Sequence, residues 1–424
     1  MIKYYKLLLL FVFPLYGYAQ PLNPWTPPEY FPSKAVLIEW DFNTYTWSLY
    51  AELIAECRLA TEVILVVRDQ AEEDQMRSLL TSEGIPLSGI SFVQVPCERM
   101  WIRDHGPLAV KTDQGVAFMD FDDLANSGLD ENLPTNLANL WGIDSYSLPY
   151  VLCGGNFMVD NHNRLFTTTR LYSNNPGYTR AHINQVFEDY MGITEILTFA
   201  PQHSDYWGHI DMQIKLLDDT TFVISEVSPG SGANYDSLEA NYARLQSLPG
   251  PHGKPYRIER LQMADDWKTY ANSLILNDRV LVPTYNHILD STALDAYARL
   301  LPDHHIVGIN CNKIIGWEGA LHCITMQLFD EAQLTSVRNL SIRDNGIHLF
   351  PNPLMQGENL CIQFTGEQSL PATVRVLTLQ GQVLQSLSWL SGDSFSFSWP
   401  HSSGAYILEV SCASGKYSQT VFTE

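Results

Sequence analysis

The chain has little positive charge. It carries 25 lysine and arginine residues against 47 aspartate and glutamate residues, which gives a formal net charge of −22. Such a surface repels phosphate backbones and anionic lipids and favours cationic ligands. We therefore expect no nucleic-acid partner. The same acidity would keep an exported protein soluble, so it does not by itself identify a ligand.

Long apolar runs are absent after the N-terminus. Residues 1–19 combine a basic start, a short apolar centre from Leu7 to Tyr16 and a small final residue, Ala19. This pattern is typical of a cleaved signal peptide and is too short for a permanent membrane span. We expect cleavage after Ala19, a mature chain with no transmembrane segment, and a secreted or cell-surface location.

Closely spaced cysteine pairs are also lacking. None of the seven cysteines belongs to a Cys-x-x-Cys motif, so we expect neither a structural zinc nor a redox pair, and no cofactor. An odd number of cysteines leaves at least one thiol without an intramolecular partner. Cys323 is the candidate for a working thiol, because it follows a glycine-containing turn and precedes an apolar run. The alternative is a small apolar core residue.

A change in composition divides the chain. We expect a linker at 337–349 and a small β-sandwich at 350–424, because short strand-like runs alternate there with Gly/Ser turns. The runs are residues 360–364, 373–379, 383–390, 394–399, 406–410 and 417–422. In its opening PNP (351–353) and its GAYIL strand (404–408), this segment resembles the sorting domain of type IX secretion cargo, which implies secretion machinery as a partner. A carbohydrate-binding or adhesive sandwich is the alternative.

The larger part, residues 20–336, carries a recurring pattern that indicates an α/β fold built from repeated units. Two strand-like runs around a short turn recur four times, and a fifth unit begins at residues 321–328. The expected hairpins are 108–111 with 116–121, 157–160 with 165–168, 212–217 with 221–226, and 273–276 with 279–282. Helical spacing follows at 180–191, 235–246 and 292–301, and earlier at 46–57 and 71–83.

Polar side chains recur just before the first strand of each unit. They are Asp104, Asn156, Asp211, Asn272 and Cys323. If the units surround an axis, equivalent positions converge on one place. We therefore expect these five residues to meet in one site.

The chemistry of such a site suits a guanidinium, which is planar and always charged and which carboxylates grip through paired hydrogen bonds. Asp104 and Asp211 would hold it against the Cys323 thiolate, and His209 would move protons. His209 and Asp211 lie two apart, so on a strand both would face the pocket. Trp101 and Trp207 offer aromatic faces to a cation.

Five ordered motifs resemble those of the agmatine deiminase and bacterial peptidylarginine deiminase family: WIRDHGP (101–107), GGN (154–156), HID (209–211), NSLI (272–275) and LHCIT (321–325). The resemblance runs from WTPPE (25–29) to about residue 328. It implies a pentein fold, a fan of five ββαβ-type units, with Cys323 as nucleophile and His209 as acid/base. It also implies Asp104 and Asp211 as guanidinium ligands and Asn272 lining the site, whereas Asn156 matches by motif only.

The expected function is therefore a secreted guanidine deiminase that converts agmatine or peptidyl-arginine to the ureido product and ammonia through a Cys thiouronium intermediate. Relatives acting on C-terminal peptidyl arginine carry carboxylate-clamping arginines after the first hairpin. Residues 122–134 contain none and hold four acids, which favours agmatine; export favours peptidyl-arginine.

Three other functions stay open. An amidinotransferase of the same fold would pass the thiouronium to an amine, and an inactive surface or adhesion protein would keep only the fold. A metal hydrolase would use His203, Asp205, His209 and Asp211 as ligands, although nothing else completes a typical ligand set.

Overall fold

In the computed structural model the chain divides into two compact units, residues 1–333 and 334–424. The structure describes residues 20–329 except 123–127, 204, 231–233 and 266, and residues 347–423 apart from gaps at several connections. The expected signal peptide and most of the expected linker lie outside the described residues. Among the helices that the structure describes, none has the length and apolar character needed to cross a bilayer.

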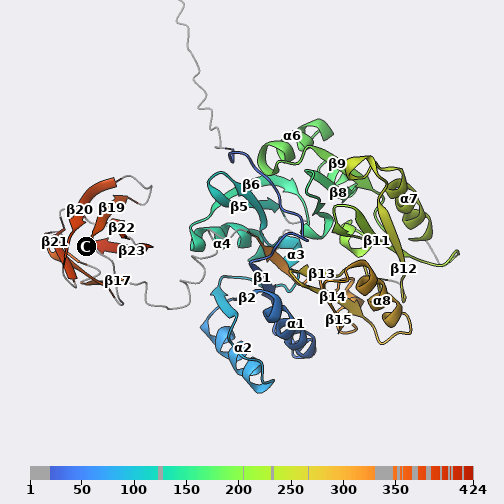
Figure 1. Cartoon of the computed structure of the whole chain (residues 1–424), viewed down its shortest axis with the longest axis horizontal. Helices are drawn as coiled ribbons and strands as arrows, with labels where there is room; N and C mark the ends of the chain where they lie inside the picture. The colour runs from blue at the N-terminus through green and yellow to red at the C-terminus, as the bar shows by residue number, and fades with distance from the viewer. Residues whose placement is uncertain are drawn as a thin grey trace, which may run out of the picture. The chain divides into compact units, whose positions relative to one another are not determined.

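The described part of the larger unit contains four three-stranded sheets of one design (Figure 1). In each, the first two strands form an antiparallel hairpin and the third joins the second in parallel. The sheets are β4 (Leu108–Thr112), β5 (Gly115–Asp122) and β6 (Asp144–Val151); β7 (Met158–Val159), β8 (Arg164–Thr168) and β9 (Glu195–Phe199); β10 (Ile214–Asp218), β11 (Thr221–Glu226) and β12 (Arg257–Gln262); and β13 (Leu274–Leu276), β14 (Arg279–Thr284) and β15 (His305–Asn310).

A helix joins the second strand to the third in each of these units, since a parallel strand pair needs a crossover connection. These helices are α4 (Leu133–Trp141), α6 (Arg180–Met191), α7 (Asn234–Ser247) and α8 (Asp290–Leu300). In the unit of β7, β8 and β9 a short helix, α5 (Arg170–Ser173), precedes α6. Gly142 and Gly192 end α4 and α6 in the left-handed conformation, as glycine does at many helix C-termini.

The first and last strands of the larger unit pair with each other. Strand β16 (Met326–Leu328) pairs antiparallel with β1 (Ala35–Glu39), which pairs in parallel with β2 (Glu62–Val67), and β3 (Ile90–Gln94) follows. Helices α1 (Trp47–Ala60) and α2 (Gln70–Ser82) connect these strands. The last strand thus completes the first unit, and the expected fan of five ββαβ-type units is confirmed.

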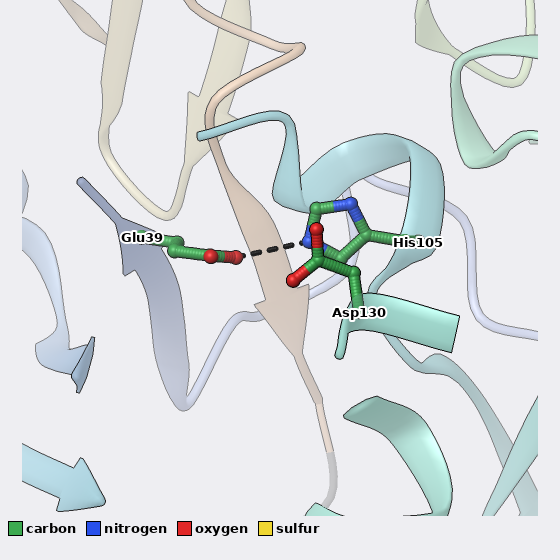
Figure 2. A group of neighbouring side chains, drawn as sticks. All are labelled: Glu39, His105 and Asp130. Carbon is green, nitrogen blue, oxygen red and sulfur yellow. Dashed lines mark hydrogen bonds and ion pairs between the residues drawn. The ribbon is translucent and has the colours of Figure 1, made fainter. Parts of the chain in front are cut away.

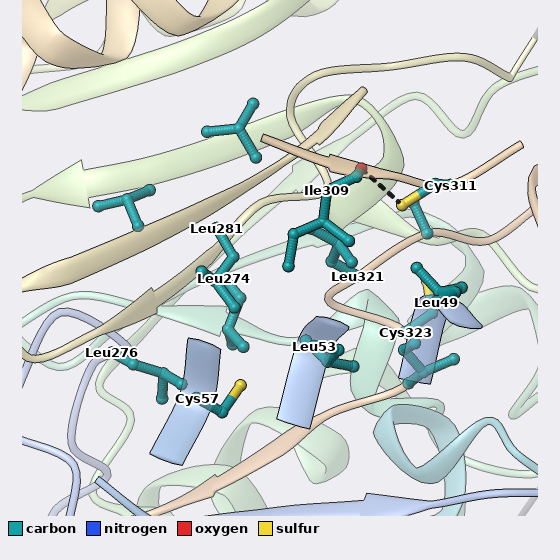
Figure 3. Packing of buried hydrophobic residues seen from close by; sticks show 14 of the residues in the cluster. Leu49, Leu53, Cys57, Leu274, Leu276, Leu281, Ile309, Cys311, Leu321 and Cys323 are labelled. Atoms are coloured by element: carbon teal, nitrogen blue, oxygen red, sulfur yellow. Dashed lines mark hydrogen bonds between the residues drawn. The ribbon is translucent and has the colours of Figure 1, made fainter. Parts of the chain in front are cut away.

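Strands from several units bury their apolar faces in one core. Figure 3 shows Leu53 of α1, Leu274 of β13 and Leu281 of β14 packed together in this cluster, each fully buried. Every residue of β1 is buried, and its first four, residues 35–38, form a continuous apolar run and not an alternating pattern. Removal of this apolar surface from water stabilises the larger unit.

The second unit has two antiparallel sheets in its described residues. One holds β17 (Ile347–Phe350), β18 (Asn359–Phe364) and β21 (Ser394–Ser398); the other holds β20 (Val383–Trp389), β19 (Ala372–Thr378), β22 (Gly404–Cys412) and β23 (Gly415–Thr423). Leu360, Val374, Trp389 and Leu408 from these sheets share one core. The expected all-β sandwich fold is confirmed, and β17 is a strand that the sequence pattern did not indicate.

Candidate active site

The five polar positions singled out by the sequence all precede the first strand of a unit. Asp104 lies in α3 (Ile102–His105) before β4, and Asn156 ends η2 (Gly154–Asn156) before β7. Asp211 lies in η3 (Ile210–Met212) before β10, while Asn272 and Cys323 lie in turns before β13 and β16. Helix α3 contacts η2, and η2 contacts η3, so these segments meet at one place.

Cys323 combines an apolar setting with polar contacts at its sulfur. It is 1% exposed and packs in the large core near Leu321 and Leu49 (Figure 3). Its Sγ lies 3.3 Å from Asn272 Nδ2 and 3.9 Å from Asp211 Oδ2. For the other buried thiols of this core, Cys57 and Cys311, no amide or carboxylate side chain of the described residues lies within hydrogen-bond distance of the sulfur. The polar contacts distinguish Cys323 from a core cysteine.

Cys323 also lines a pocket of about 100 Å³. The predicted residues Asp104, His209, Trp101 and Trp207 line the same pocket. Asn272 and Asp211 are not on this lining, although both contact the thiol from the protein interior.

Asn156 is placed apart from the thiol. Its side-chain oxygen accepts a hydrogen bond from the Thr168 backbone N–H at 2.8 Å, and it does not line the pocket. Its neighbour Gly155 explains the motif: a Cβ there would lie 3.0 Å from His209 Cδ2 and 3.1 Å from Asp104 Oδ1. The glycine lets the backbone pass against the polar side chains of the site.

His209 and Asp104 form a charged pair in the pocket. His209 Nε2 lies 3.4 Å from Asp104 Oδ1, and the Trp207 ring stacks on the imidazole at 6.4 Å between centroids. Burial disfavours the charged imidazole, but the carboxylates of Asp104, Asp205 and Asp211 outweigh burial and raise the pKa of His209. The ring therefore holds a proton that it can donate.

The expected strand geometry at His209 and Asp211 was wrong. His209 caps η3, and Asp211 lies inside that single turn, whereas β10 begins only at Ile214. The turn brings both side chains to the site without strand alternation. Asp205 fixes the segment, because its carboxylate accepts the backbone N–H groups of Gly208 and His209 at 2.7 and 2.8 Å.

Asp211 is a buried carboxylate with two different oxygens. Oδ2 faces His322 Nδ1 at 2.6 Å, whereas Oδ1 has no hydrogen-bond partner among the described residues. Burial alone would raise its pKa, but the His322 hydrogen bond and the charges of His322, His209 and Arg103 lower it overall. The carboxylate is therefore ionised, with one oxygen available to a ligand.

The surroundings of the Cys323 thiol disfavour its thiolate form. Burial raises its pKa well above the ordinary value, and the nearby Asp211 and Asp104 carboxylates raise it further. A thiolate needs a cation beside it. A ligand carrying positive charge would supply one.

Further residues form the pocket rim, and of these the sequence argument named only Asp205, as a possible metal ligand. They are Arg99, Asp205, Trp267, Trp317, Glu318 and Gly319. A Cβ at Gly319 would lie 2.4 Å from the Trp101 ring, so this glycine lets the indole reach the pocket. The position of residues 316–320 just before Cys323 was the available signal for Trp317 and Glu318.

Sequence reasoning also missed a charged network behind the thiol. It contains Glu29, His322 and Lys215, all with buried or nearly buried side chains. His322 stands next to Cys323, and Glu29 ends the WTPPE segment that opens the family resemblance. Both residues belong to motifs of the family resemblance, but neither motif indicated that Glu29 and His322 lie in contact.

The ligand set of a metal hydrolase is not assembled around the pocket. His203 does not line it, and both oxygens of Asp205 accept backbone N–H groups. Within the described ranges, the one group of three potential metal ligands is Glu39, His105 and Asp130 (Figure 2). There His105 Nε2 lies 2.9 Å from Glu39 Oε2, and Arg99 Nε donates to Asp130 at 2.7 Å. These contacts form an ion-pair network that balances its own charge.

Known proteins share these features. Residues 25–328 match the model of the Porphyromonas-type peptidyl-arginine deiminase family. An agmatine deiminase of Pseudomonas syringae pv. syringae is 24% identical over 355 residues, which cover 71% of this chain and 94% of that protein. A solved Porphyromonas gingivalis protein assigned as an arginine deiminase is 28% identical with a TM-score of 0.67, covering 72% of this chain and 98% of its own. The Enterococcus faecalis agmatine deiminase structure is 21% identical with a TM-score of 0.65, covering 74% and 100%.

Proposed function

The chain belongs to the Porphyromonas-type peptidyl-arginine deiminase family and is a guanidine deiminase, a hydrolase of amidine C–N bonds; within that class, we propose that it acts on agmatine or a similar guanidine whose far end lacks a carboxylate. The products would be the ureido compound and ammonia. The observation that carries this proposal is the charge balance of the pocket rim.

Arg99 is the single arginine or lysine on the described pocket lining, and it faces a buried acid. Its Nε donates to Asp130 Oδ2 at 2.7 Å, and the Asp130 side chain is fully buried. Glu318 adds a negative charge to the rim and acts on His209 electrostatically. A rim with a balanced arginine and an extra acid favours an amine over a carboxylate.

Asp130 also corrects one premise of the sequence argument. It was counted among four acids of a loop that would repel a carboxylate, but its carboxylate points inward and accepts from Arg99 and the Glu98 backbone N–H. Residues 123–127 of that stretch lie outside the described residues. The preference for an amine therefore rests on the pocket rim.

The proposed reaction begins with the guanidinium between the Asp104 and Asp211 carboxylates. Its charge favours loss of the Cys323 proton to solvent, and the thiolate forms a C–S bond to the central carbon. His209 donates its proton to one nitrogen, the C–N bond breaks, and ammonia leaves a thiouronium. Neutral His209 then takes a proton from water and the hydroxide adds to the same carbon. The C–S bond breaks as the C=O bond forms, and the hydroxyl proton passes to solvent, which gives the ureido product and the thiolate.

Ammonia release from four guanidines tests the substrate. The set is agmatine, free arginine, and peptides with an internal or a C-terminal arginine. We expect kcat/KM for agmatine to exceed that for free arginine by at least about tenfold, equivalent to about 1.4 kcal/mol. A preference for C-terminal arginine would contradict the proposal. Transfer of the amidino group to an added amine would instead indicate the amidinotransferase. No reaction with any of the four guanidines would indicate an inactive fold.

We also propose that residues 1–19 direct export and that the second unit serves sorting through a type IX system. The basic and apolar pattern of residues 1–19 supports the first point, and the small sandwich with its PNP opening supports the second. Mass spectrometry of protein from the culture medium tests both. We expect a mature chain beginning at Gln20 and no export after deletion of 347–424; an intact Met1 in exported protein would contradict cleavage.

A further inference from the structure

A chain of four ionisable side chains runs through the interior beside the thiol. Asp211 Oδ2 lies 2.6 Å from His322 Nδ1, and His322 Nε2 lies 2.8 Å from Glu29 Oε2. Lys215 Nζ donates to Glu29 Oε1 at 2.5 Å. Their side chains range from 1% to 18% exposed, so solvent screens these contacts little.

The imidazole of His322 lies between two carboxylates, one at each ring nitrogen. An ionised carboxylate only accepts hydrogen bonds, and a neutral imidazole has one N–H to give. Burial alone would raise the pKa of Glu29, but Lys215 and His322 lower it well below the ordinary value. With both carboxylates ionised, each of the two contacts is a hydrogen bond only where the ring nitrogen carries a proton.

The surroundings hold this ring in place. The His322 backbone N–H donates to Asn272 Oδ1 at 3.0 Å, and its carbonyl accepts from Arg103 Nε at 3.2 Å. Arg103 is a further charged side chain close to the network. Burial lowers the pKa of its guanidinium, although the Glu29 and Asp211 carboxylates act in the opposite direction. The ring is thus fixed from both its backbone and its side chain.

The network lies between two cavities. Cys323, which Asp211 contacts, lines the pocket described above. Glu29 and His322 line a second cavity with Arg103 and mainly apolar side chains, and the two cavities share no lining residue. His322 therefore binds the same Asp211 oxygen, Oδ2, that the sulfur contacts, and Oδ1 is left without a hydrogen-bond partner among the described residues.

We propose that His322 and Glu29 are positioning residues for Asp211. This inference rests on the proposed function. The His322 imidazolium binds Oδ2, fixes the rotation of the carboxylate and keeps it ionised, so that Oδ1 is aimed at the guanidinium. Glu29, balanced by Lys215, keeps the second proton on the ring.

Two conservative substitutions separate the two bonds of the ring. The amide nitrogen of His322→Asn falls near Nδ1 and retains a donor to Asp211, while that of His322→Gln falls near Nε2 and retains the contact to Glu29. We expect His322→Gln to raise KM for agmatine at least tenfold, and His322→Asn to raise it less than threefold. Glu29→Gln removes the negative charge, so the acid limb of kcat/KM moves to higher pH.

The chain offers a matched control. Glu39 and His105 are also a buried carboxylate–imidazole pair, at 2.9 Å, with side chains 2% and 1% exposed (Figure 2). For Glu39→Gln we expect a KM within about twofold of the wild-type value. We expect its acid limb to lie within about 0.2 pH unit of that of the wild type, on the order of measurement error. A merely structural role would make the three variants of His322 and Glu29 lose stability with no difference in KM between His322→Asn and His322→Gln.

Nitrogen-15 NMR of the histidine rings provides a readout that needs no turnover. We expect the His322 signals, identified by their loss in His322→Gln, to show both ring nitrogens protonated at pH 7 in the wild type and one of them protonated in Glu29→Gln. A singly protonated His322 in the wild type, or equal KM values for the two His322 variants, would overturn the inference. A wild type that releases no ammonia would refute the proposed function instead, and the ring signal would still decide the charge arrangement.

Discussion

Asn272 Nδ2 lies 3.3 Å from Cys323 Sγ, and both side chains are fully or almost fully buried. The amide stands beside the sulfur without adding charge, while the Asp211 and Asp104 carboxylates raise the pKa of the thiol. The contact places a donor where a thiolate would need one. It joins the turn before β13 to the turn before β16.

Asn272→Asp should make the thiol less reactive. The substitution keeps the shape and adds a third carboxylate near the sulfur, so the pH at which Cys323 reacts with iodoacetamide should rise by about one unit or more. The measurement is the alkylation rate against pH, with folding checked by denaturation. An unchanged alkylation profile would mean that the amide does not influence the thiol.

Cys323→Ala should abolish ammonia release and leave the fold intact. The loss of a single buried sulfur costs about 1 kcal/mol of stability, whereas loss of the nucleophile removes the covalent route. Cys311→Ala is the matched control, because Cys311 lies in the same core, its Sγ lies 3.5 Å from the Ile309 carbonyl oxygen, and it does not line the pocket. Equal activities in the two variants would show that Cys323 is not the nucleophile.

The stability of the larger unit should fall in acid. The pKa values of Glu29 and Asp211 are lowered in the folded chain, so the unfolded chain binds more protons below its carboxylate pKa of about 4. The two carboxylates contribute their full stabilisation above that pH. This stabilisation is lost as the pH falls through their pKa values in the folded chain. Urea unfolding at pH 3, 4 and 7 should show this slope in the wild type and a smaller slope in Glu29→Gln. The same slope in both would show that Glu29 is not a source of acid lability.

Glu318→Gln should weaken the selection of a cationic substrate. Glu318 lies on the pocket rim, and its charge favours a distal amine. We expect kcat/KM for agmatine to fall by roughly three- to tenfold, as for loss of one partly screened charge, with little change for an uncharged alkylguanidine. Asp295→Asn, which removes an exposed acid from α8, controls for net charge. Equal losses for both substrates would place the effect at the guanidinium end.

Local patterns revealed the fan because each unit is short. The hairpin around Asn277 and Asp278 and the alternating strand at 394–398 follow from neighbouring residues, and the structure confirms both. The closure of β1 with β16 joins residues almost 300 positions apart, as does the contact of His322 with Glu29. No local periodicity encodes such pairs.

The turn at His209 was mispredicted for a related reason. Two residues spaced by one intervening residue fit a strand, and nothing in the HID segment itself signals a single helical turn. Asp205 decides the conformation by accepting two backbone N–H groups. The sequence therefore indicated which side chains meet but not the backbone that carries them.

Gly155→Ala should reduce activity more than stability. The added Cβ would lie 3.0 Å from His209 Cδ2, 3.1 Å from Asp104 Oδ1 and 3.3 Å from Asp211 Oδ1, so those side chains must move. Because a shift of a few tenths of an ångström misaligns a proton donor and two guanidinium ligands, we expect kcat/KM to fall by about 100-fold.

The control for this glycine is Gly177→Ala, where an added Cβ has no atom within 4 Å. That variant should keep wild-type kinetics. Thermal denaturation of both variants separates local crowding from global unfolding, since both should melt within a few degrees of the wild type. Full activity in Gly155→Ala would mean that the imidazole and the two carboxylates tolerate displacement, and that the close passage of η2 does not set the geometry of the site.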